Sequence, residues 1–187
     1  MIAAYGRHYG ERYQAISDLI PAGASVLDVC CGPGILYQRY LRPKTVSYTG
    51  LDINEKFVRD VISYGAQGRV QDLCSDDPLP DADYVVMQAS LYHFLPNAGP
   101  IVTRMVAAAR SAVIIAEPIR NLSNSRLRLL SWLARNITNP GRGTPPQRFT
   151  EATLTELFSQ LDLVESKTFL IGGRERVYVF RVDSEEN

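Results

Sequence analysis

Short apolar stretches alternate along the chain with amphipathic ones. The apolar runs predict five strands, at residues 26–29, 46–51, 68–73, 83–88 and 111–116. Apolar residues three and four positions apart predict helices at 54–64, 99–110 and from 151 onward, with Asn54 and Thr150 as the expected N-caps. Strands that alternate with helices in this way indicate an α/β sheet.

The end of the chain has a different pattern. Residues 163–171 and 174–182 are predicted strands, and Gly172-Gly173 between them is the strongest hairpin signal in the sequence. A parallel dehydrogenase sheet does not need such a hairpin, so the ending favours a sheet whose last strand is antiparallel.

The first 20 residues predict a helix with an aromatic face. Tyr5, His8, Tyr9 and Tyr13 recur at spacings of three and four residues, and the helix is expected to end before Pro21. This face either packs on the domain or covers a ligand site as a lid. An aromatic lid would suit a cationic ligand.

Residues 26–37 read as a strand, a tight turn and a helix, which is the arrangement of a ligand-binding turn. Gly32 and Gly34 permit backbone angles that other residues avoid and let a ligand approach the main chain. A dinucleotide turn would need a third glycine where Tyr37 stands, and Pro33 removes an N–H that a pyrophosphate would use. A P-loop is excluded because no Gly-Lys-Ser or Gly-Lys-Thr follows.

The stretch Asp28-Val29-Cys30-Cys31-Gly32-Pro33-Gly34 resembles motif I of class I S-adenosylmethionine-dependent methyltransferases, D-x-G-x-G-x-G, with Cys30 in place of the first glycine. This resemblance implies a Rossmann-like α/β fold with seven strands, the last antiparallel, and helices on both faces. The stretch after the fifth strand departs from a minimal methyltransferase and predicts a small helical lid inserted there. It also implies S-adenosylmethionine as cofactor, S-adenosylhomocysteine as product, and no metal.

A carboxylate about 20 residues beyond the turn, at the end of the next strand, usually holds the ribose. Asp52 has this position, and its resemblance to the family residue implies that it grips both ribose hydroxyls. By the same resemblance Asp72 holds the adenine amino group, although it could also be an ordinary loop carboxylate. The resemblance places further cofactor contacts at Tyr9, Asp28, Cys30, Gly32, Gly34, Ile53, Leu73 and Gln88.

The acceptor is expected near residues 89–94, because ligands of open α/β sheets bind at the carboxyl ends of the strands. This stretch resembles the small-molecule branch of the family and lacks the Asn-Pro-Pro-Tyr type motif used on amide or base nitrogens. His93 is a candidate general base, or a histidine that holds the loop by a hydrogen bond. Glu117 could act as a base, bind a cationic group, or pin a neighbouring loop.

Composition limits the class of protein. The length of 187 residues with 45% hydrophobic content suits a single domain over residues 1–187, and 20 basic and 20 acidic residues cancel, so nucleic acid is not an expected partner. Cys30, Cys31 and Cys74 are odd in number and two are adjacent, which fits neither a disulfide framework nor a zinc site and implies a cytoplasmic location. No apolar run approaches the ~20 residues needed to span a bilayer.

Residues 119–148 form a basic insertion in this neutral protein. Six arginines and no acidic residue lie between Glu117 and Glu151. Residues 122–137 predict an amphipathic helix, which could be a lid with a solvated basic face, a recognition element for a carboxylate or phosphate on the acceptor, or a peripheral membrane contact.

These observations favour an S-adenosylmethionine-dependent methyltransferase that acts on a small molecule, including one with an acidic or lipid-like group. Two alternatives stay open. One is a binding module without chemistry, in which Cys30 spoils the site, and the other is a nucleotide-dependent oxidoreductase. The identity of the acceptor and the oligomeric state are not encoded in any motif of the chain.

Overall fold

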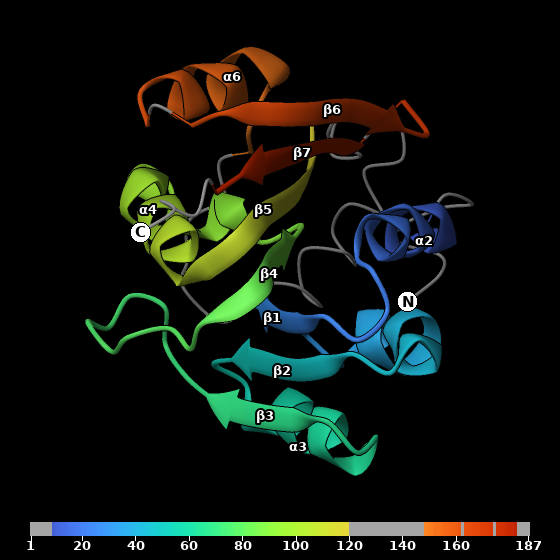
Figure 1. Cartoon of the computed structure of the whole chain (residues 1–187). Coiled ribbons are helices and arrows are strands. Elements are labelled where there is room, and N and C mark those ends of the chain that lie inside the picture. The colour runs from blue at the N-terminus through green and yellow to red at the C-terminus, as the bar shows by residue number, and fades with distance from the viewer. Residues whose placement is uncertain (1–8, 120–147, 162, 174, 183–187) are drawn as a thin grey trace, which may run out of the picture.

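A computed structural model describes residues 9–119, 148–161, 163–173 and 175–182. Its centre is one seven-stranded sheet with the strand order β3-β2-β1-β4-β5-β7-β6 (Figure 1). The strands are β1 (Ser25–Val29), β2 (Ser47–Asp52), β3 (Gln67–Val70), β4 (Ala82–Gln88), β5 (Ala109–Pro118), β6 (Glu165–Ile171) and β7 (Glu175–Arg181).

The first five strands are parallel, and β7 runs antiparallel to both β5 and β6. The predicted terminal hairpin is confirmed, since Gly172 and Gly173 join β6 to β7 with φ of 56° and 65°. The chain moves outward from β1 to β3 and then returns to place β4 beside β1. Ligands of open α/β sheets bind at such a reversal of strand order, at the carboxyl ends of the strands.

Helices cover both faces of the sheet. Helices α4 (Ala98–Ala108) and α6 (Glu151–Ser159) pack on one face, and α2 (Tyr9–Leu19) and α3 (Glu55–Ser63) pack on the other (Figure 1). Asn54 and Thr150 cap α3 and α6 as predicted, because their side chains accept hydrogen bonds from the N–H groups of Lys56 and Thr153. Together with the sheet, this is the Rossmann-like methyltransferase fold expected from the sequence.

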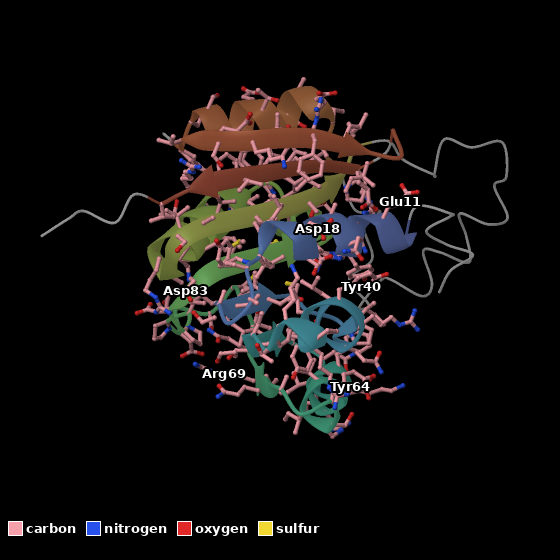
Figure 2. All side chains as sticks on the ribbon, turned by 45° about the vertical axis from the view of Figure 1, so that its right-hand side comes forward. Glu11, Asp18, Tyr40, Tyr64, Arg69 and Asp83 are labelled. Atoms are coloured by element: carbon pink, nitrogen blue, oxygen red, sulfur yellow. The ribbon has the colours of Figure 1, made fainter. Side chains whose placement is uncertain are left out.

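The segment after the glycine turn is less regular than the predicted helix. It contains a π-helical segment η1 (Tyr37–Leu41) and a 3-10 turn η2 (Arg42–Lys44). Tyr13 of α2 stacks on Tyr40 of η1 with ring centroids 5.6 Å apart, and Figure 2 shows Tyr40 below α2, whose two ends are marked by Glu11 and Asp18. This contact fixes α2 beside the turn.

Two predicted strand boundaries change. The third strand ends at Val70 rather than at residue 73, so Asp72 lies in the following turn. The fifth strand extends to Pro118, because Glu117 and Pro118 pair with Arg176 and Glu175 of β7. Glu117 is therefore part of the sheet and not of the loop after it.

Candidate functional site

The glycine turn lies at the carboxyl end of β1. Gly32 and Gly34 have φ of 55° and 69°, in the left-handed region that favours glycine. A Cβ on Gly34 would lie 2.7 Å from Val61 of α3, whereas a Cβ on Gly32 would have no atom within 4 Å. Gly34 thus permits close packing of α3, and Gly32 leaves open space above the main chain.

Tyr37 occupies the position of the third glycine in a dinucleotide turn. Its ring is buried and stacks on Tyr48 of β2 at 4.8 Å between centroids. The close helix-to-strand contact of a dinucleotide site therefore does not form here, which argues against the oxidoreductase alternative.

Cys30 also has a left-handed backbone, with φ of 57°. The turn therefore keeps the conformation that the first glycine of the motif would adopt, although an L-residue is strained there by about 1–2 kcal/mol. Burial and the nearby carboxylates of Asp52, Asp28 and Glu117 raise the pKa of the Cys30 thiol far above its usual value. The thiol is consequently protonated and unreactive at neutral pH.

Replacing Cys30 by Gly should give a protein about 1 kcal/mol more stable than replacing it by Ala, because both variants lose the thiol but only alanine keeps a Cβ at positive φ. Urea unfolding of the two variants measures the difference. The same pair of substitutions at Cys74, which is exposed and not at positive φ, should show no advantage for glycine. An alanine variant at position 30 as stable as the glycine variant would show that the turn is unstrained.

Asp52 ends β2 and fixes the turn. Its Oδ2 accepts a hydrogen bond from the N–H of Gly32 at 2.9 Å, and its Oδ1 accepts one from the N–H of Asn54 at 2.8 Å. Each carboxylate oxygen keeps a further lone pair for a ligand. Partial burial raises the pKa of Asp52, and the hydrogen bonds from Asn54 and Gly32 oppose this shift. The next residue, Ile53, has 64% of its surface exposed, which is unusual for a large apolar side chain.

Asp72 and Leu73 follow β3. The exposed Asp72 accepts a hydrogen bond from the N–H of Cys74 at 2.8 Å, so it caps a local turn, as the loop alternative expected. The Leu73 side chain is only 4% exposed and belongs to the core. A ligand at this point would therefore meet the Asp72 carboxylate and the Leu73 main chain.

Asp28 is a buried carboxylate directly below the turn. It is 1% exposed and accepts a hydrogen bond from the Tyr48 hydroxyl at 2.7 Å. Burial raises its pKa to about 7; Tyr48, Arg12 and Gln88 oppose the shift, and the Asp52 charge adds to it. Among the described residues, Asp28 Oδ1 and Gln88 Oε1 are buried without a hydrogen-bond partner. Tyr48 was not identified from the sequence, although strand alternation and pairing of 26–29 with 46–51 would have placed it beside Asp28.

A buried ion pair joins α2 to the start of β7. Arg12 Nη1 lies 2.9 Å from Glu175 Oε1, and the two side chains are 4% and 16% exposed. The sequence did not predict this ion pair, since Arg12 lies within an apolar helix face and its partner is 163 positions away. The pair holds α2 against the carboxyl edge of the sheet.

Glu117 pins the loop after β4. Its carboxylate, in a residue that is 1% exposed, accepts a hydrogen bond from the N–H of Leu91 at 2.6 Å. Burial raises the pKa of Glu117 to about 7, and the N–H groups of Leu91 and Ser90 and the charges of Arg148 and Arg12 oppose this. Within the described part of the chain its Oε2 is buried and has no partner. Loop pinning, one of the three predicted roles, is therefore observed.

His93 lies on the 3-10 segment η3 (Leu91–Phe94), with an exposed side chain. Its ring contacts Tyr92 with centroids 3.9 Å apart and makes no hydrogen bond to another described residue. Partial desolvation, followed by the charge of Arg148, lowers the pKa of His93, so the imidazole is neutral at pH 7. The Arg148 guanidinium lies 3.5 Å from the centre of the Tyr92 ring, a contact that the sequence did not predict.

Other predicted features lie outside the described residues. These are Tyr5, His8, the side chain of Tyr9, and nearly all of the basic insertion, including residues 122–137. Within the described ranges there is no group of three or more His, Cys, Asp and Glu side chains suited to a metal ion. The helices of those ranges include none that could cross a bilayer.

Comparisons with known proteins identify a family and a fold for this chain. The family model described as "Methionine biosynthesis protein MetW" matches residues 10–165. No curated protein sequence matches the chain. The structure is similar to the magnesium protoporphyrin IX methyltransferase of Synechocystis PCC 6803 with bound S-adenosylhomocysteine, with a TM-score of 0.71, 17% identity, and coverage of 94% of this chain and 84% of that one.

Two further structures show the same likeness. A TehB-like S-adenosylmethionine-dependent methyltransferase from Corynebacterium glutamicum has a TM-score of 0.67 and 20% identity over 97% of this chain and 92% of its own. An S-adenosylmethionine-dependent methyltransferase from Aquifex aeolicus has a TM-score of 0.60 and 16% identity over 94% and 90%. At these identities the likeness establishes the fold.

Proposed function

The chain belongs to the MetW family and has the fold of S-adenosylmethionine-dependent methyltransferases, and from this premise we propose that it transfers a methyl group from S-adenosylmethionine to a small-molecule acceptor. The observation that carries the proposal is the hydrogen bond from the Gly32 N–H to Asp52, which joins the open glycine turn to a carboxylate at the point where the strand order reverses.

The residues at this edge of the sheet fit the cofactor. Asp52 offers two lone pairs to the ribose hydroxyls, exposed Ile53 offers an apolar surface to the adenine, and the open space above Gly32 admits a ligand close to the main chain. Buried Asp28 and half-buried Asp52 give the turn a negative environment, which suits the ammonium and sulfonium of S-adenosylmethionine.

Bound S-adenosylmethionine supplies an electrophilic methyl carbon: an acceptor lone pair forms the new bond as the C–S bond breaks, and the electron pair of that bond stays on the sulfur of S-adenosylhomocysteine. The main task of the protein is to hold the acceptor in line and exclude water, which contributes several kcal/mol to lowering the barrier. Neutral His93 can take the acceptor's proton at an imidazole nitrogen, and buried Glu117 holds the loop that carries His93.

The family description favours a second candidate function, because it names methionine biosynthesis and not a methyl transfer. In this alternative the chain binds S-adenosylmethionine without using it and reports its concentration to a partner. The strained Cys30 in place of a glycine is compatible with this role as well.

Calorimetric titration with S-adenosylhomocysteine and incubation with methyl-labelled S-adenosylmethionine and a small-molecule extract test the proposal together. We expect saturable binding and a labelled low-mass product. Binding without labelled product favours the sensing module, and no binding of either nucleoside contradicts both candidates.

A further inference from the structure

An arginine from the segment before α6 lies over an aromatic ring of the loop that follows β4. Arg148 stacks on Tyr92, whose ring is buried, with 3.5 Å between the guanidinium carbon and the ring centre. Tyr92 is itself fixed, because the neighbouring Leu91 donates its N–H to buried Glu117 of β5. Stacking restricts the guanidinium to a plane and leaves the donors at its edge available.

Those donors are not used by the described part of the protein. Arg148 makes no ion pair and no hydrogen bond with any described residue, although Arg12, Arg59, Arg110 and Arg176 all pair with carboxylates. The charge of Arg148 lowers the pKa of Glu117, but the two side chains do not form an ion pair. An arginine at the ligand edge of a sheet that is positioned by a ring and has no ion-pair partner among the described residues indicates an external anion.

His93 contributes a second donor at the Tyr92 ring. Its ring contacts the same Tyr92 at 3.9 Å, its side chain is exposed, and the charge of Arg148 acts on it. Because the imidazole is neutral at pH 7, it contributes a hydrogen bond without a charge. The buried carboxyl group of Glu117 is close enough to offset part of the charge of Arg148, which suits a single negative charge better than a doubly charged phosphate.

The acceptor loop also faces the glycine turn. The charge of Glu117 acts on the Cys30 thiol, and the N–H of Ala89, at the start of the loop, donates to Ala116 at 2.7 Å. The turn, the end of β5 and the loop that carries His93 therefore border one region at the carboxyl ends of the strands.

We propose that Arg148 and His93, presented by the ring of Tyr92, bind a monocarboxylate group of the acceptor. That the ligand is the methyl acceptor rests on the proposed function. That the ligand carries a carboxylate rests on the contacts of Arg148. The substrate class is accordingly a small organic acid, bound through its carboxylate next to the transferred methyl group.

The test uses butyrate as the probe and uncharged butyramide as its matched control. The chain has two histidines, so imidazole NMR signals can be assigned with a His8→Asn variant. With wild-type protein we expect the His93 signals to shift saturably with butyrate and not with butyramide. Arg148→Gln should weaken butyrate binding at least fivefold, whereas Arg181→Gln, an exposed arginine at the opposite ends of the strands, should bind as wild type does.

Equal shifts with butyramide, or unchanged butyrate affinity in Arg148→Gln, would overturn the inference. If that variant does not fold, His93→Ala takes its place in calorimetry, with a threefold loss expected and no loss contradicting the proposal. All titrations are run with and without S-adenosylhomocysteine. Failure to bind this nucleoside would contradict the proposed function alone, and the butyrate titration would still test the carboxylate site.

Discussion

Asp52→Ala is expected to weaken the binding of S-adenosylmethionine by about 1–3 kcal/mol, a roughly 5- to 150-fold loss of affinity. Two losses combine in this variant. The ribose hydroxyls lose an acceptor, and the Gly32 N–H loses the hydrogen bond of 2.9 Å that holds the turn in place. Calorimetric titration of the variant and the wild-type protein measures the effect directly.

The control for this variant is Asp81→Ala, which removes an exposed carboxylate from the loop before β4 and should leave the affinity unchanged. Asp52→Asn separates the two losses, because its amide oxygen can still accept from the Gly32 N–H while the charge is gone. We expect it to bind more tightly than the alanine variant and more weakly than the wild-type protein. Wild-type affinity in Asp52→Ala would show that this carboxylate does not hold the cofactor.

Much of the fold could be predicted because its signals are local. The buried strand β4 is encoded by the apolar run at 83–88, the hairpin by Gly172-Gly173, and the starts of α3 and α6 by their capping residues. Strand ends were less accurate. Glu117 was predicted just outside its strand, since its place inside depends on pairing with Arg176, which is 59 positions away along the chain.

The residues of the candidate site also differ in whether local sequence signals could identify them. Asp52 and the glycines could be assigned from spacing along one strand-turn-strand unit, and the structure joins Asp52 to Gly32. The Tyr48–Asp28 hydrogen bond, the Arg12–Glu175 pair and the Arg148–Tyr92 contact each connect elements that meet only in the folded sheet. Each lies at or near the carboxyl ends of the strands, so the sequence predicted a ligand site there but not the side chains that surround it.

The contacts at this edge of the sheet compensate its two buried carboxyl groups only in part. Asp28 and Glu117 are both almost fully buried, and each has one oxygen without a hydrogen-bond partner among the described residues. Burying such groups costs stability unless a partner compensates. Two of them, at the carboxyl ends of the two strands that flank β4, are expected of a site whose ligand brings positive charge.

Asp28→Asn should therefore stabilise the protein at pH 8 while it weakens cofactor binding. The pKa of Asp28 is raised from 3.8 to about 7, so between these values the native state retains a proton that the unfolded state has lost. The free energy of unfolding contributed by this group consequently falls as pH rises through that window, and the penalty is complete above pH 7. Since asparagine carries no charge, we expect it to add about 4 kcal/mol at pH 8 and almost nothing at pH 3.5.

Urea unfolding of the variant and the wild-type protein at both pH values measures this change in stability. The comparison uses the difference between the two proteins, because Glu117 titrates in the same pH window in both. Tyr48→Phe is the matched control with the opposite sign: it removes the hydroxyl that donates to Asp28 at 2.7 Å and should destabilise the protein most at pH 8. At that pH, Asp28→Asn should weaken S-adenosylmethionine at least fivefold and S-adenosylhomocysteine less, because only the former carries a sulfonium charge. A variant that is no more stable at pH 8, or that loses both nucleosides equally, would mean that the buried charge of Asp28 does not act on the ligand.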